Sequence, residues 1–128
     1  MNPPLAFRHV APSERPDRAS RWPDTWAQVV CNHQTPTDRL VAAIVTVAPH
    51  KPVPLHYHRV ETLEYVLSGA ARVRDRHGNE TIVSADSAVY FPAGPGAAHE
   101  WAVIGNSPVQ VLFMYNAPHG EDDGLTRA

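Results

Sequence analysis

The sequence predicts an all-β fold, a sandwich or barrel of eight or nine short strands. Thirteen prolines and seven glycines in 128 residues divide the chain into short pieces, which disfavours long helices. These pieces have the character of short β segments separated by turn residues, and none shows a convincing apolar period of 3.6 residues. The length suits one domain, and we find neither an internal repeat nor a second domain.

The expected strands follow one another closely along the chain. In order they are residues 26–31, 39–48, 64–67, 71–76, 80–84, 88–91, 99–104 and 109–116. Residues 39–48 are nearly all apolar in their centre, so we expect burial on both faces. Both faces of 109–116 are mostly apolar as well, which predicts a central strand or one buried in a dimer contact. Residues 76–79 predict a tight hairpin turn with Gly78 at a positive φ.

Gly69 is expected to mark a bulge that reverses the alternation of the chain. Ala71 and Val73 would then point inward, and the intervening arginines at 72, 74 and 76 would form a solvated face. Outside the barrel, residues 1–24 are interpreted as an irregular arm and residues 117–128 as a polar tail. The barrel itself is expected to span residues 25–116.

Composition excludes several classes of function. A net charge of −2 gives no broad basic surface for nucleic acid. Cys31 is the single cysteine, so an intrachain disulfide and a cysteine-based zinc site are both excluded, which fits a reducing cytoplasm. No long apolar run predicts a secretory signal or a membrane anchor, and no hydrolase, kinase or dinucleotide glycine motif is present. We therefore expect a cytoplasmic protein.

Two histidines one residue apart are the first candidates for chemistry. His56 and His58 in the stretch PLHYHRVETLEYVLSG share one face of an extended chain, with Cα atoms about 6.6 Å apart. Two imidazoles at that separation can converge on one divalent ion. The pair alone is a weak signal, since two surface histidines would give the same pattern.

The context of the pair resembles the cupin superfamily. Its first motif, G-x5-HxH-x3-4-E-x6-G, is matched by His56, His58 and Gly69, and its second, G-x5-PxG-x2-H-x3-N, by 92–94 and His99. The resemblance covers roughly residues 40–115. It implies a single jelly-roll barrel with a metal held by His56, His58 and His99.

The departures from the family pattern leave three interpretations of the site. Thr62 stands where the ligand glutamate is expected, Val103 stands at the asparagine position, and four residues rather than two separate PxG from His99. The site is expected to hold its metal with three histidines alone. Alternatively, Glu64, which shares the inner face, replaces the missing ligand through a slipped or bulged strand, or the site holds no metal.

The remaining site residues are assigned by face. Glu64 would serve as general acid or base, and the Thr62 hydroxyl would hydrogen-bond water or substrate. The expected substrate pocket is lined by Tyr90, Trp101, Phe113 and Tyr115, with core packing as the alternative for each. Of the other histidines, His50 is retained as an outside candidate ligand; the rest are interpreted as surface residues.

The resemblance implies a small organic substrate and a divalent cofactor, with Fe(II) favoured and Mn, Ni or Zn also suitable. The leading hypothesis is a non-haem Fe(II) dioxygenase-like oxidoreductase. The alternatives are a redox-silent isomerase, cyclase or lyase that uses Glu64 as acid or base, and a non-catalytic ligand-binding module. Family analogy also implies a homodimer.

Overall fold

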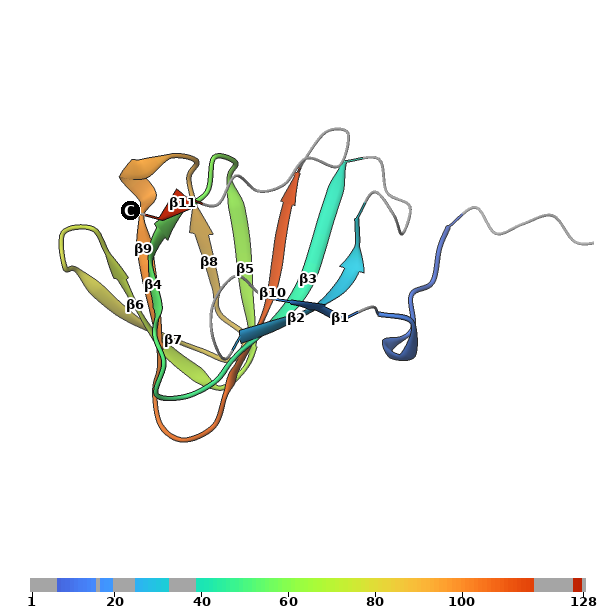
Figure 1. Cartoon of the computed structure of the whole chain (residues 1–128), viewed down its shortest axis with the longest axis horizontal. Coiled ribbons are helices and arrows are strands. Elements are labelled where there is room, and N and C mark those ends of the chain that lie inside the picture. The colour runs from blue at the N-terminus through green and yellow to red at the C-terminus, as the bar shows by residue number, and fades with distance from the viewer. Residues whose placement is uncertain (1–6, 16, 20–24, 33–38, 117–125, 128) are drawn as a thin grey trace, which may run out of the picture.

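The computed structural model describes residues 7–15, 17–19, 25–32, 39–116 and 126–127. Two antiparallel sheets face each other and enclose the core, as the all-β prediction requires (Figure 1). The larger sheet has the order β1 (Asp17–Ala19), β2 (Thr25–Cys31), β3 (Leu40–Val47), β10 (Val109–Asn116), β5 (Thr62–Ser68) and β8 (Ala88–Phe91). The smaller sheet has the order β11 (Thr126–Arg127), β4 (Val53–Tyr57), β9 (His99–Val103), β6 (Ala70–Asp75) and β7 (Glu80–Ser84).

The central strands of the larger sheet are the most apolar ones. β10 lies between β3 and β5, which confirms its expected central place. Val109 pairs with Val47 at one end of the ladder, and Tyr115 pairs with Val41 and with Thr62 at the other. Because side chains alternate along a strand, these residues all face the smaller sheet. The inward residues near Val109 therefore lie at one end of the space between the sheets, and those near Tyr115 lie at the other.

The main core is built largely from valine. Val66 and Val109 are completely buried, and Ala71, Val73 and Trp101 join them in one cluster between the sheets. β-Branched side chains suit the pleated surfaces of two packed sheets. Burial of each valine contributes roughly 1.5–3 kcal/mol to folding.

Gly69 connects the two sheets. It lies between β5 and β6 with φ +82°, and a Cβ at this position would stand 2.6 Å from the carbonyl oxygen of Pro108. The chain reverses its alternation here as expected, because Val66 and Ala71 are both buried although five residues apart.

The outer face of the smaller sheet is charged, as predicted. Arg72, Arg74 and Arg76 are exposed. Arg74 contacts Glu80 at 3.0 Å and Glu100 at 3.4 Å in exposed ion pairs. Gly78 adopts φ +84° in the hairpin that follows, which confirms the expected turn.

Two short strands lie where irregular chain was expected. The arm contains a 3-10 turn, η1 (Pro12–Glu14), and β1, which pairs with β2. In the tail, β11 pairs with β4, with Arg127 opposite His56. Three and two residues are too few to show an alternating pattern, so sequence gave no sign of them. The rest of the arm and tail lies outside the described residues. Within the described part of the chain, no helix is long and apolar enough to cross a membrane.

Candidate metal centre

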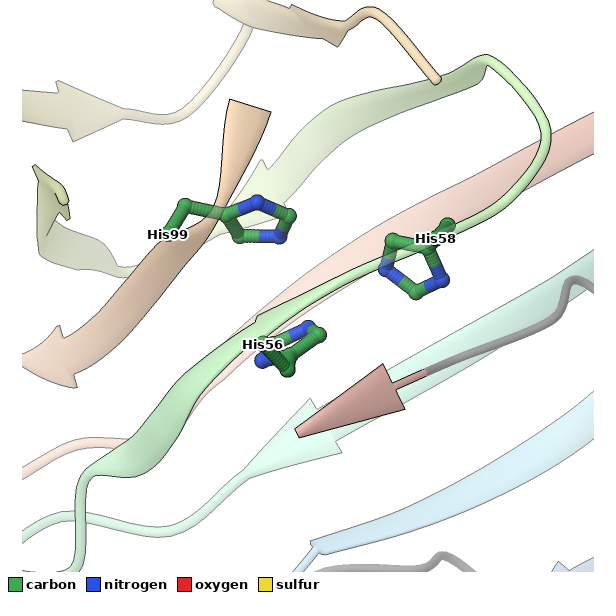
Figure 2. A group of neighbouring side chains, drawn as sticks. All are labelled: His56, His58 and His99. Carbon is green, nitrogen blue, oxygen red and sulfur yellow. The ribbon is translucent and has the colours of Figure 1, made fainter. Parts of the chain in front are cut away.

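Three buried histidines meet between the sheets. His56 and His99 are direct partners in the pairing of β4 with β9, and His58 follows the end of β4. Figure 2 shows the three rings gathered where β4 approaches the beginning of β9. Their exposed fractions are 5%, 5% and 2%, and each offers a ring nitrogen within 4.8 Å of the other two. Two segments forty residues apart thus supply one cluster.

Backbone carbonyls fix the orientation of two of the rings. The Nδ1 of His56 lies 2.7 Å from the carbonyl oxygen of Pro54, and the Nδ1 of His99 lies 2.8 Å from that of Ala97. A carbonyl oxygen can only accept, so each Nδ1 carries the proton and donates it. The lone pair is then on Nε2, as a metal-binding imidazole requires.

The long gap before His99 has a structural role. The extra Pro95 and Gly96 form a 3-10 turn, η2 (Pro95–Ala97), whose last carbonyl accepts the hydrogen bond from His99. Gly94, at φ +99°, donates its N–H to the carbonyl oxygen of His58 at 2.8 Å. The insertion therefore orients one histidine, and the loop is anchored beside another.

The electrostatics of the cluster keep His99 neutral. Burial lowers the pKa of His99 to about 3, a shift opposed by its hydrogen bond to Ala97 and increased by the neighbouring His56 and His58. The ring of Phe91 stacks on that of His99 with centroids 3.6 Å apart. Neutral imidazole is the form that binds metals.

These residues fit a divalent metal ion. The Nε2 of His99 is buried without a hydrogen-bond partner, which is costly unless another group binds there. An ion with tetrahedral bonds of about 2.1 Å holds its nitrogens roughly 3.4 Å apart, so a closure on the order of 1 Å brings the three ring nitrogens, which lie within 4.8 Å of one another, into range. Three imidazoles suit iron, zinc, nickel or copper and leave coordination positions open.

The two candidate catalytic side chains lie on β5, on the inner surface. Thr62 is 2% exposed, pairs with Phe91 and Tyr115, and has a buried hydroxyl without a hydrogen-bond partner. Glu64 pairs with Phe113, and its Oε2 is buried. Among the described residues, the group able to hold a metal consists of the three histidines without Glu64. This arrangement agrees with the three-histidine interpretation.

An aromatic wall stands beside His58. The ring of Phe113 lies 5.4 Å from that of His58 and 5.4 Å from that of Tyr115. Trp101, by contrast, belongs to the main core, with its ring 6.5 Å from that of Phe91. The structure therefore brings Phe113 and Tyr115 to the site and places Trp101 in the packing role that was its alternative.

The prediction for Tyr90 is wrong. Its side chain is 57% exposed on the outer face of the larger sheet, and its hydroxyl donates to Glu61 at 2.7 Å. The inward residue of β8 is its neighbour Phe91, which sequence reasoning missed. Alternation along 88–91 left open which of the two adjacent aromatic residues faces inward, and nothing else in these four residues decides it.

The remaining described histidines are not part of the site. His9, His50 and His77 are exposed, and His50 occupies a turn with φ +73°. The outside candidate His50 therefore lies away from the cluster. His33 and His119 lie outside the described residues.

Comparison with known proteins agrees with this architecture. The structure is similar to the polyketide cyclase RemF from Streptomyces resistomycificus, with TM-score 0.76 and 18% identity over 92% of this chain and 89% of that one. It is similar to KdgF from Halomonas sp., with TM-score 0.70 and 17% identity over 92% and 97%. A variant of oxalate decarboxylase from Bacillus subtilis gives TM-score 0.68 and 20% identity over 91% of this chain and 31% of that one, so the chain spans about a third of that enzyme.

Identities this low show a shared fold and nothing finer. A search of curated proteins finds no match in sequence. The family model for the cupin domain matches residues 43–115, which is more than half of the chain and includes all three histidines. The chain belongs to the cupin family.

Proposed function

We propose that this cupin is a metal-dependent enzyme that transforms a small organic substrate by proton transfer, as an isomerase, cyclase or lyase does. The observation that supports it best is the set of three converging imidazoles with a separate carboxylate, Glu64, on the same inner surface. Because the group able to hold the metal consists of the three histidines, Glu64 would act on the substrate and not as a ligand.

Each group has a distinct task in this proposal. A divalent ion held by His56, His58 and His99 would polarise a carbonyl or enol oxygen of the substrate. Glu64 would accept a proton from the substrate carbon and return it at another position. The Thr62 hydroxyl, buried without a partner, would donate to a substrate oxygen. Phe113 and Tyr115 would exclude water from that side of the reacting groups.

A dioxygenase-like oxidoreductase is the second candidate. The absence of a carboxylate from the ligand set favours it, because a three-histidine site with Fe(II) would leave positions for substrate and dioxygen. In that case Glu64 would orient the substrate without transferring its proton. A ligand-binding module without turnover is the third possibility, and the same experiment tests it.

The first measurement is the metal content of protein purified without chelators. We expect one divalent ion per chain in the wild type and strongly reduced occupancy in His58→Ala, because the variant lacks one of three ligands. His77→Ala is the matched control, since His77 is exposed in the hairpin. Equal metal content in all three proteins would remove the proposed centre.

The second measurement separates the reaction classes. Deuterium exchange into metal-chelating carbonyl compounds, followed by NMR, reports proton transfer, and an oxygen electrode reports dioxygen uptake. We expect Glu64→Gln to retain the metal and to lose about a hundredfold or more in exchange rate. Glu61→Gln is the matched control, because that carboxylate is exposed on the outer face.

Substrate-dependent dioxygen uptake that survives Glu64→Gln would favour the oxygenase instead. Saturable binding of such compounds with neither exchange nor dioxygen uptake would favour the binding module.

We also propose that two copies pair through the outer face of the larger sheet. Trp26, Leu40, Leu63 and Leu67 are each 39–52% exposed on that face, whereas the opposite outer face carries ion pairs. Exposed apolar side chains of this size on one face of a sheet are typical of an interface. Light scattering should give a dimer mass for the wild type and a monomer mass for Leu63→Lys; a monomeric wild type would contradict the proposal.

A further inference from the structure

We infer that Phe91 is a positioning residue of the metal centre: its ring holds the imidazole of His99 in a fixed plane and favours the metal-bound form of that imidazole. This inference rests on the proposed metal centre and adds to it a residue that is not a ligand. Three observations carry it: the stack of the two rings, the packing that holds Phe91 itself, and the hydrogen bond that His99 makes at its other nitrogen.

The ring of Phe91 covers one face of the His99 ring. Their centroids lie 3.6 Å apart and their planes are inclined by 17°, so the two rings are in contact face to face. Phe91 ends β8 in the larger sheet and His99 begins β9 in the smaller one, so the contact joins the two sheets. Both side chains are buried. A close contact in a packed interior leaves the imidazole little room to tilt.

Phe91 is itself held from two sides. It lies opposite Thr62 in the pairing of β5 with β8, and both side chains point to the inner surface. Its ring meets that of Trp101 at 6.5 Å and 60°, an edge-to-face geometry that aromatic pairs prefer. Trp101 lies two residues beyond His99 on β9, and both Trp101 and Phe91 belong to the main core. The packed core therefore fixes the place of the Phe91 ring.

The stack and the hydrogen bond of His99 restrict different motions. The hydrogen bond from Nδ1 to the carbonyl oxygen of Ala97, 2.8 Å long, fixes one edge of the imidazole. The ring could still tilt about the line that joins these two atoms, and Phe91 on its face prevents this tilt. Together the two contacts fix the direction of Nε2, which is buried without a hydrogen-bond partner. A ligand that is already ordered loses less entropy when it binds an ion.

The stack is also expected to become more favourable when an ion binds. Two neutral aromatic rings prefer an offset or edge-to-face arrangement to a face-to-face one, because the negative faces of the rings repel each other. An imidazole bonded to a divalent ion gives up electron density, and the negative face of a phenyl ring attracts positive charge. The contact of Phe91 with His99 therefore favours the metal-bound protein over the metal-free one, which adds to the affinity for the ion.

Titration of the metal-free, full-length chain with Co(II), followed by the visible spectrum of the ion, tests the role of the ring. We expect Phe91→Leu, which keeps an apolar side chain, to weaken Co(II) binding by about tenfold and to change the spectrum, because the spectrum depends on ligand geometry. Phe91→Tyr keeps the ring and should bind Co(II) within about threefold of the wild type.

Val47→Ala is the matched control for lost packing. Val47 belongs to the same main core as Phe91, but it pairs with Val109 at the other end of the ladder from the histidines. Its truncation should lower the stability of the protein, since it removes buried apolar volume, and should leave the affinity for Co(II) and the visible spectrum unchanged.

Proton NMR of the metal-free protein reports the stack directly. The electrons of an aromatic ring shield protons that lie over its face, so the carbon-bound ring protons of His99 should be shifted upfield relative to those of the exposed His77. The upfield shift should be lost in Phe91→Leu and retained in Val47→Ala.

The possible failures are distinguishable. A wild-type protein that does not bind Co(II) overturns the proposed function and this inference with it. If the wild type binds Co(II) and Phe91→Leu binds it within about threefold as tightly, the inference is overturned and the metal centre stands. An equal loss of affinity in Phe91→Tyr or Val47→Ala, or a wild-type spectrum without the upfield shift, overturns the inference in the same way.

Discussion

The two ends of the barrel interior are built from different chemistry on the same strands. Along the inner face of β5 the residues run from Thr62 through Glu64 to Val66. We call the region around His56, His58, His99 and Thr62 the histidine end, and the region around Val47, Val66 and Val109 the valine end. The valine end is apolar and buried, whereas the histidine end buries the Thr62 hydroxyl and the His99 Nε2 without hydrogen-bond partners.

This contrast separates stability from function. Buried apolar side chains contribute favourably to folding, and buried polar atoms without hydrogen bonds cost roughly 1–3 kcal/mol each. Buried polar atoms without hydrogen bonds are expected mainly at functional sites, where a bound ligand can supply the missing hydrogen-bond partner. Substitutions at the two ends should therefore have opposite consequences, and pH should act at one end alone.

The largest expected effect is the acid sensitivity that His99 confers on the metal-free protein. Its folded pKa of about 3 lies below the ordinary value of 6.5, because burial disfavours the charged ring. Above 6.5 the contribution of neutral His99 is fully present. As the pH is lowered from 6.5 to 3, the unfolded chain takes up a proton that the folded chain does not, so the free energy of unfolding falls by a total on the order of 5 kcal/mol.

Urea denaturation at several pH values measures this effect. His99→Gln should flatten the acid limb of the stability curve, whereas His77→Gln, in the exposed hairpin, serves as the control. Parallel curves for the wild type and His99→Gln would show that His99 is not a buried neutral imidazole in the folded chain.

The sequence was sufficient to predict the barrel and the three histidines of the site. Prolines, glycines and alternating apolar residues predicted the barrel, and the two histidine motifs predicted which rings would meet. Each of these signals lies within a short stretch of consecutive residues, so it can be recognised without knowledge of tertiary contacts. The three histidines are brought together as expected, and the family match confirms the fold.

Features that depend on which face a residue takes were harder to predict. Tyr90 and Phe91 are adjacent and aromatic, so one step of alternation exchanges an outer-face residue for a ring stacked on His99. Likewise, β11 depends on its pairing with β4, which is set by tertiary contact and not by its own two residues. The register of β11 against β4 could therefore not be predicted from the residues of β11.

A smaller effect is expected from substitution of Gly69, which connects the two sheets beside the valine end. Gly69→Ala should cost about 3 kcal/mol, because alanine at φ +82° is strained and its Cβ would overlap the carbonyl oxygen of Pro108. Gly78→Ala has a similar φ of +84° but meets no atom within 4 Å, so it should cost about 1 kcal/mol. The difference between the two losses of stability, measured by urea denaturation, gives the cost of the overlap with Pro108 apart from the backbone strain that both variants share. Equal losses would show that the chain around Gly69 is loosely packed.

The smallest effect is expected from exchange of valine and threonine, which have similar shapes, at one position in each end. Val66→Thr places a hydroxyl in the fully apolar end and should destabilise the protein by about 2 kcal/mol. Thr62→Val removes a buried hydroxyl that has no partner and should stabilise the metal-free protein by about 1 kcal/mol. Both residues lie inward on β5 and differ little in volume, so packing changes are matched. A loss of stability in both variants would mean that the Thr62 hydroxyl is already satisfied in the folded chain, and that the histidine end does not hold it ready for a substrate.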